Sequence, residues 1–179
     1  IARQAAPLAE QVHLHVTGEP LLHPEFRKII KICAEHKLPV EITTNGTLMR
    51  SANAESLFEP IVRQVNISMH SLAEKDTMRL HEIFDFTRKA FTRHPGLYIN
   101  YRLWNLGSSK ESLESEKNEW LHRKIEEEFS IIIPAAGHSA GRKSRKLLNR
   151  LYLHLDTCFD WPEIKEGTPV RTKGRCHAM

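Results

Sequence analysis

Three short polar segments of the chain combine residue types that turn the backbone and bind ligands. They are Thr17-Gly18-Glu19-Pro20, Thr43-Thr44-Asn45-Gly46 and Asn66-Ile67-Ser68-Met69-His70-Ser71. Glycine permits tight turns and close approach of a ligand to the backbone, and the Glu, Asn, Ser, Thr and His side chains supply hydrogen-bond donors and acceptors. The segments therefore predict loops that hold a polar or charged ligand.

Each polar segment lies at the end of a stretch in which apolar and polar residues alternate, which is typical of a strand with one buried face. Between these stretches lie amphipathic segments with helix signals, such as Pro24 in a first turn and the closing His94-Pro95-Gly96. Alternating strands and helices indicate right-handed βαβ units, so the predicted fold class is α/β with a parallel sheet. The predicted strands are residues 12–17, 40–45, 65–70, 97–104 and 151–156, the predicted helices are 24–38, 54–58, 80–91 and 109–128, and 135–146 is a predicted loop or linker.

The predicted strands carry apolar residues on one face and an unusual set of polar residues on the other. Because the amphipathic helices pack on the apolar face, either the polar face lies in water or the sheet curls into an open barrel whose lumen holds a ligand. Histidine, asparagine and arginine are costly to bury without partners, so their abundance favours a lumen with a charged or hydrogen-bonding guest. The polar face comprises His13, His15, Thr17, Glu41, Thr43, Asn45, Asn66, Ser68, His70, Asn100, Arg102, Tyr152, His154 and Asp156.

Much of the net charge of +4 comes from one basic segment, Arg142-Lys143-Ser144-Arg145-Lys146, followed by Arg150. Such a segment can contact phosphates, but a solvated linker or a helix start is the favoured interpretation, and nucleic acid is not an expected partner. No apolar run is long enough to span a bilayer, and residues 1–11 lack the pattern of a signal peptide. We therefore expect a soluble, cytoplasmic protein without a membrane partner.

The three cysteines, Cys33, Cys158 and Cys176, are far apart and odd in number, so they suggest no disulfide framework. Cys33 falls on the apolar face of a predicted helix and is interpreted as a core residue. The chain begins at Ile1 and ends three residues beyond Cys176. We interpret it as a single domain excised from a longer polypeptide.

In their order and spacing, the three polar segments resemble motifs of the radical S-adenosylmethionine (SAM) enzymes. The resemblance covers about residues 1–105 and includes Leu21-Leu22-His23-Pro24 after the first segment and Thr47-Leu48 after the second. Further along, Arg102-Leu103-Trp104-Asn105 and Phe159-Asp160-Trp161-Pro162 resemble a subset with a cysteine-rich C-terminal extension, the SPASM type. In that subset a sequence like Gly174-Arg175-Cys176 introduces the extension.

The resemblance implies a partial (βα)6 TIM-like barrel over residues 1–156, truncated at both ends, with residues 157–179 leading into a missing SPASM-like extension. It also implies an oxidoreductase with a [4Fe-4S] cluster and SAM, which is cleaved reductively to a 5′-deoxyadenosyl radical. That radical abstracts hydrogen from a peptide, protein or small-molecule substrate. A reductant such as flavodoxin or ferredoxin is the implied electron donor.

The resemblance also assigns cofactor-binding roles. Gly18 and Glu19, with Pro20, would meet the methionyl amino group of SAM, largely through the backbone. Thr44 and Asn45 would lie on the adenosine side. The third strand would bring Ser68 and His70 to the cofactor, and Arg102 would pair with its carboxylate. From the residues alone, Gly18-Glu19-Pro20 and Asn45-Gly46 are equally compatible with ordinary turns, and Arg102 with a structural bridge to Glu41 or Asp156.

One feature of the family is absent. The sequence has no C-x-x-x-C-x-x-C motif, so the chain by itself is expected neither to hold the cluster nor to cleave SAM. Cys176 is either the first ligand of an auxiliary iron–sulfur cluster or a free thiol. Two other classes remain open: a non-catalytic α/β binding domain that uses residues 142–150, and an enzyme with metal ligands at His13 and His15, for which lumen-lining histidines are the favoured alternative.

Overall fold

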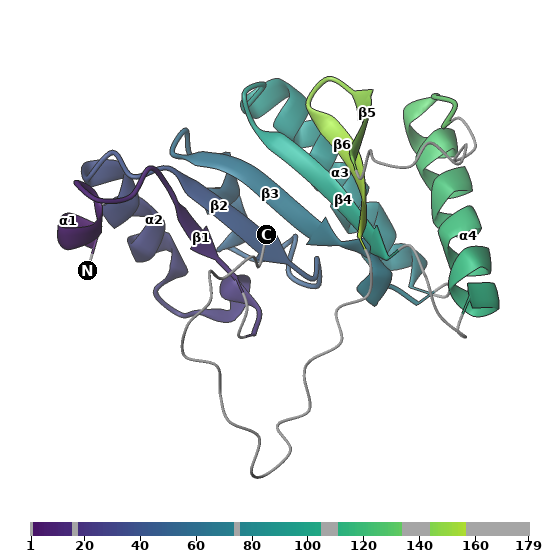
Figure 1. The fold of residues 1–179 in the computed structure, drawn as a ribbon, viewed down its shortest axis with the longest axis horizontal. Helices are drawn as coiled ribbons and strands as arrows, with labels where there is room; N and C mark the ends of the chain where they lie inside the picture. The colour runs from purple at the N-terminus through teal and green to yellow at the C-terminus, as the bar shows by residue number, and fades with distance from the viewer. Residues whose placement is uncertain (1, 16–17, 74–75, 105–110, 134–143, 157–179) are drawn as a thin grey trace, which may run out of the picture.

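The computed structural model describes residues 2–15, 18–73, 76–104, 111–133 and 144–156. The described strands form one six-stranded sheet in the order β1-β2-β3-β4-β6-β5 (Figure 1). All neighbouring strands are parallel except β5, which runs antiparallel to β6. The bounds are β1 Val12–Leu14, β2 Val40–Thr44, β3 Val62–Ser68, β4 Tyr98–Trp104, β5 Ser144–Leu148 and β6 Leu151–Asp156.

Helical segments lie between successive strands from β1 to β5, as βαβ units require, and α1 precedes β1. In chain order they are α1 Ala2–Ala5, the 3-10 turn η1 Pro20–Leu22, α2 Phe26–Glu35, η2 Ala54–Phe58, η3 Met69–Ser71, α3 Thr77–Arg93 and α4 Glu111–Phe129. The predicted α/β class, with parallel strands that alternate with helices, is confirmed and is consistent with a partial TIM-like barrel. None of the helices in the described part of the chain is long and apolar enough to cross a membrane.

The core lies between the apolar face of the sheet and the helices. Residues of β2 alternate between buried and half-buried along the strand, and Val40, Ile42 and Thr44 are the buried ones. Tyr101 of β4 is fully buried against α3, where its hydroxyl hydrogen-bonds to Thr87 at 2.7 Å. This alternation leaves the polar residues on the opposite face of the sheet, as the sequence predicts.

The charged helix predicted over 109–128 is α4, which packs beside α3. Leu121 and Ile125 are its buried residues in the described range. Phe129 at its end lies against Phe84 and Phe91 of α3, with ring centroids 5.4 and 6.1 Å apart. Sparse apolar positions are therefore sufficient to attach this helix to the core.

The predicted loop or linker over 135–146 is wrong at its C-terminal end, because Ser144–Leu148 is the edge strand β5. Asn149 has φ +47°, a left-handed conformation that asparagine tolerates, and closes a tight turn into β6. The charges of Arg145 and Lys146 suggested a solvated linker or a helix start. An edge strand accommodates such charges because one of its sides faces solvent.

The predicted end of the third strand also needs correction. The strand ends at Ser68, and His70 lies in the 3-10 turn η3. His70 therefore belongs to the loop after β3 and not to the row of strand side chains. Val16, Thr17 and residues 157–179, with Cys158 and Cys176, lie outside the described residues.

Candidate functional site

The carboxylate of Glu19 joins the loop after β1 to the end of β2. Its Oε1 accepts hydrogen bonds from the backbone N–H of Leu21 (3.1 Å) and the hydroxyl of Thr44 (2.8 Å), and its Oε2 accepts one from the backbone N–H of Asn45 (2.8 Å). We call this arrangement the Glu19 clamp. Because the side-chain oxygens are occupied by protein donors, the backbone of Gly18 and Glu19 is what this loop can offer to a ligand.

Gly18 and Gly46 give these two loops their turns. Gly18 has φ +86°, and a Cβ added to it would have no atom within 4 Å. Gly46 has φ +76°, but a Cβ there would lie 2.7 Å from Cδ1 of Ile83 on α3. Gly18 therefore borders open space at the carboxyl edge of the sheet, whereas Gly46 is packed against a helix.

Asn45 is held at two of its polar groups besides the N–H bound by the Glu19 clamp. Its Oδ1 accepts from the backbone N–H (2.9 Å) and hydroxyl (2.6 Å) of Thr47. Its carbonyl oxygen accepts from Ser71 and Arg79. Within the described part of the chain, its Nδ2 is left as a donor that faces no protein acceptor.

The loop after β3 is tied to the same edge. The hydroxyl of Ser71 donates to the carbonyl oxygen of Ser68 (2.7 Å) and lies 3.3 Å from that of Asn45. Arg79 of α3 donates to both Asn45 and Ser71, and Lys117 of α4 donates to the carbonyl oxygen of His70. The loops after β1, β2 and β3 therefore form one connected carboxyl edge, where ligands of parallel α/β folds bind.

The polar face of the sheet carries a hydrogen-bonded network centred on Glu41. Its Oε1 accepts from the side-chain amides of Gln64 (2.9 Å) and Asn66 (2.7 Å), and its Oε2 lies 3.4 Å from Nδ1 of His13. The amide of Asn100 donates to Oδ1 of Asn66 at 2.8 Å. Described residues of four neighbouring strands thus share one polar network on the face that the helices leave uncovered.

Closer to the carboxyl edge, a second row crosses the same face. Ser68 is the register partner of Arg102, and Arg102 is the register partner of His154. Adjacent strands lie about 4.8 Å apart, so the three side chains lie side by side. Of the predicted cofactor residues, Gly18, Glu19, Pro20, Asn45 and His70 lie in the loops of this edge, and Thr44 is the last residue of β2. Ser68 and Arg102 lie in the row across the polar face.

Metal binding finds no support in the described residues. No group of three His, Cys, Asp or Glu side chains in residues 2–15, 18–73, 76–104, 111–133 and 144–156 could hold an ion. The rings of His13 and His15 meet edge to face with centroids 5.9 Å apart, and His13 also contacts Gln11 (3.0 Å) and Glu41. Burial in the core raises the pKa of the Cys33 thiol, which disfavours the thiolate that a cluster requires.

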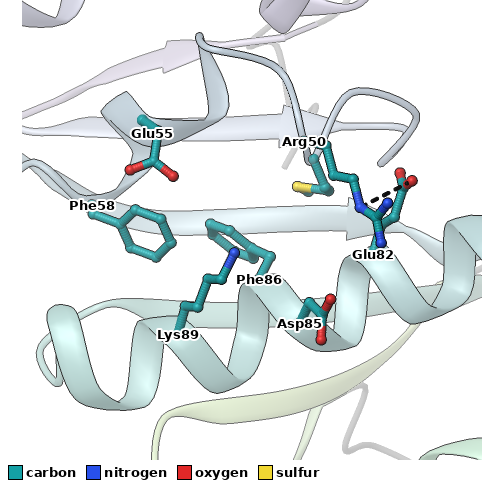
Figure 2. Close-up of a pocket in the computed structure, with 8 residues that line it drawn as sticks. Arg50, Glu55, Phe58, Glu82, Asp85, Phe86 and Lys89 are labelled. Atoms are coloured by element: carbon teal, nitrogen blue, oxygen red, sulfur yellow. Dashed lines mark ion pairs between the residues drawn. The ribbon is translucent and has the colours of Figure 1, made fainter.

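Two of the open cavities lined by described residues lie on the helical side of the protein. One, of about 430 Å³, is bordered by the loop after β2, η2 and α3. Nε of Arg50 in that loop lies 3.3 Å from the carboxylate of Glu82 on α3, and Figure 2 shows the two side chains directed toward each other. Phe58 and Phe86 form its apolar wall, with centroids 5.1 Å apart. The other, of about 640 Å³, lies between α2 and η2. Neither cavity is lined by Glu19, Thr44 or Asn45 of the Glu19 clamp, and neither is lined by the residues of the polar network around Glu41.

Comparison with known proteins agrees with this geometry. Residues 1–95, more than half of the chain, match the radical SAM superfamily. A stretch of 57 residues is 44% identical to a GTP 3′,8-cyclase of Microcystis aeruginosa (strain NIES-843 / IAM M-2473), covering 31% of this chain and 17% of that protein. The comparison with solved structures found no match. The chain belongs to the radical SAM superfamily.

Membership of this superfamily implies SAM and a [4Fe-4S] cluster. The chain does not supply the cluster ligands, because its three cysteines are widely separated and lack the C-x-x-x-C-x-x-C spacing. SAM fits the residues present better, because the carboxyl edge offers open space beside Gly18 and a side-chain donor on Asn45. The SPASM subset and the auxiliary cluster at Cys176 stay predictions.

The sequence did not predict three residues whose side chains hydrogen-bond to the backbone of the loops. Arg79, Lys117 and Asn53, whose amide donates to the carbonyl oxygens of Leu21 (2.9 Å) and His23 (3.1 Å), all contact loop backbone. Their partners are backbone carbonyls far away in the sequence. No residue pattern marks such a contact before the fold is known.

Proposed function

We propose that this chain is the central part of a longer radical SAM oxidoreductase and binds SAM at the carboxyl edge of its sheet. The observation that carries the proposal is the Glu19 clamp, which joins the loop of Gly18 to that of Thr44 and Asn45. SAM carries an amino group, a carboxylate and an adenosine. Connected loops that expose backbone acceptors and side-chain donors are complementary to those groups.

The first two loops bind opposite ends of the ligand in this proposal. The backbone of Gly18, Glu19 and Pro20 meets the methionyl amino group, since the Glu19 carboxylate is already occupied. Thr44 positions the loop through its bond to Glu19. Asn45 offers its Nδ2 to an acceptor on the adenosine, with its orientation fixed by the two bonds that its Oδ1 receives from Thr47.

The strand residues complete the site. Arg102 pairs with the carboxylate of SAM, and its register partner Ser68 contacts the cofactor beside it. His70, in the turn after β3, lines the same edge. When bound beside a cluster held by residues outside this segment, SAM supplies a 5′-deoxyadenosyl radical that abstracts hydrogen from the substrate.

The substrate is proposed to lie over the polar face, where amides, histidines and tyrosines offer hydrogen bonds. The matched relative is named for a reaction of GTP, which makes small polar molecules a substrate class to test beside peptides and proteins. A soluble, cytoplasmic enzyme of this kind would take its electron from a protein such as flavodoxin or ferredoxin. The chain covers only a small part of the relative, so substrate and partners belong to the proposal.

The test uses the full-length protein, reconstituted with iron and sulfide without oxygen. The protein is then reduced in the presence of SAM, and the 5′-deoxyadenosine released is measured. Release of 5′-deoxyadenosine is the expected result. A folded, reconstituted protein that neither binds nor cleaves SAM would contradict the proposal and leave a binding domain with the fold alone.

The Asn45→Asp variant assigns the activity to this site. It keeps the side-chain oxygen that Thr47 binds but replaces the Nδ2 donor by an acceptor. The loss of one buried hydrogen bond should weaken SAM binding about tenfold or more. Lys28→Ala, which removes an exposed ion pair with Glu25 on α2, is the matched control and should bind SAM as the wild type does. Unchanged affinity of Asn45→Asp would remove Asn45 from the site.

A further inference from the structure

Arg79 lies behind the carboxyl edge and contacts two of its loops at once. Its Nη2 donates to the carbonyl oxygen of Asn45 and to the hydroxyl of Ser71 (2.9 Å), and its Nη1 lies 3.4 Å from the carboxylate of Asp76. Ser71 in turn donates to the carbonyl oxygen of Ser68. One guanidinium therefore connects the end of β2 to the turn after β3.

The placement of this charge is unfavourable for the helix alone. Arg79 is the third residue of α3, and a cation near a helix N-terminus opposes the helix dipole. The side chain is only 15% exposed, so its desolvation must be offset by specific partners. The partners are loop atoms, apart from Asp76, which suggests that the arginine serves the loops and not the helix.

We infer that Arg79 is a positioning residue, which fixes the Asn45 carbonyl and Ser71 so that the loops after β2 and β3 hold SAM in one geometry. The inference rests on the proposed function. Asn45 is then fixed from both sides: the Glu19 clamp holds its N–H, and Arg79 holds its carbonyl oxygen. Arg79 acts through these residues and needs no contact with the cofactor.

The planar guanidinium is specific to this task. It presents two nitrogens in a fixed fork, one toward Asp76 and one toward Asn45 and Ser71. A lysine has a single, strongly hydrated ammonium on a flexible chain and cannot hold the three partners in the same geometry. Arg79→Lys therefore keeps the charge and removes the positioning.

The experiment compares full-length wild type, Arg79→Lys and Arg93→Ala for SAM affinity and for the rate of 5′-deoxyadenosine release. Arg93 is the matched control, because it lies on the same helix, pairs with Glu55 (2.9 Å) and packs over Phe58 (4.1 Å), away from the loops. We expect the KM for SAM to rise about tenfold in Arg79→Lys, with kcat at saturating SAM within about twofold of wild type. Arg93→Ala should lower the thermal midpoint and leave the KM unchanged.

A double-mutant cycle with Ser71→Ala tests whether both residues act through one contact. The double variant should lose less affinity than the product of the two single losses, because each single change already breaks the same link. Wild-type affinity in Arg79→Lys, or strictly multiplicative losses, would overturn the inference. Failure of the wild type itself to bind SAM would instead overturn the proposed function.

Discussion

Gly18 and Gly46 both adopt left-handed backbone conformations, but a side chain at the two positions would meet opposite surroundings. Open space lies beside Gly18, while the end of the Ile83 side chain lies beside Gly46. The first glycine is required by its backbone angle and leaves room for a ligand. The second is required both by its angle and by the close packing of α3 against the loop.

Substitution by alanine should therefore lower the free energy of unfolding by different amounts at the two glycines. Gly18→Ala should lower the free energy of unfolding by about 1 kcal/mol, from backbone strain alone. Gly46→Ala adds a steric clash and should lower it by about 3 kcal/mol. Urea denaturation measures both values.

Ile83→Val provides the control for this pair, because valine lacks the Cδ1 atom that lies 2.7 Å from the added Cβ. In the Gly46→Ala background this change should recover part of the lost stability, whereas in wild type it should cost about 1 kcal/mol. Equal losses for the two glycine variants would show that packing against α3 does not matter.

At the residue scale, the sequence predicted the loop residues but not their supports. Gly18, Glu19, Thr44 and Asn45 stand in short motifs that follow strand patterns, so their position at one edge could be anticipated. The use of the Glu19 carboxylate as a clamp could not, because it depends on the distance between two loops.

At the element scale, period-two alternation located the parallel strands well, because each has one buried face. The strand β5 was not predicted, because the density of basic residues suggested a linker or a helix start there. Asn149, a residue type that tolerates the left-handed conformation of a tight turn, precedes the alternating run Leu151–Asp156 and is the signal that could have revealed the hairpin. The strand ends were less predictable, since η3 continues the polar pattern of β3 in a different conformation.

Helix α4 gives a pH dependence that follows from its packing. Burial lowers the pKa of His122 from the ordinary value of 6.5; Glu126 and Glu119 oppose this shift and Arg145 of β5 adds to it. The unfolded chain therefore binds a proton that the folded chain resists. The fold therefore has its full free energy of unfolding at a pH above the pKa that His122 has in the unfolded chain. As the pH falls below that pKa, the free energy of unfolding decreases.

His122→Gln should remove this contribution. We expect the thermal midpoint of the wild type to fall more than that of His122→Gln between about pH 7.5 and about pH 5.5. The carboxylates that titrate at lower pH are common to both proteins, so the difference isolates the histidine. Parallel curves for the two proteins would show that His122 does not resist protonation in the fold.

At the scale of the whole molecule, the helices cover one face of the sheet and leave a hydrogen-bonded polar face on the other (Figure 1). The sequence predicted this division, although it did not predict that Glu41 would gather Gln64, Asn66 and His13 around itself. The network satisfies the side-chain amides of this face by hydrogen bonds within the protein.

The position of Cys33 in the core indicates the role of this residue, the only cysteine among the described residues. Cys33 is part of the core on α2, and burial raises its pKa. Cys33→Ala in the full-length protein should therefore leave the iron content and SAM cleavage unchanged, with a modest loss of stability of about 1 kcal/mol. Loss of iron in this variant would place Cys33 among the cluster ligands and contradict the structure.

The strand order also constrains how the polypeptide folds during its synthesis. Strands β2, β3 and β4 each pair with a strand that precedes them in the chain, so each can join the sheet as it leaves the ribosome. Strand β6 lies between β4 and β5, so β5 has no partner until β6 has been made. In the nascent chain β5 therefore stays unpaired after the first four strands have assembled. The β5–β6 hairpin then docks on β4 as a late, long-range step.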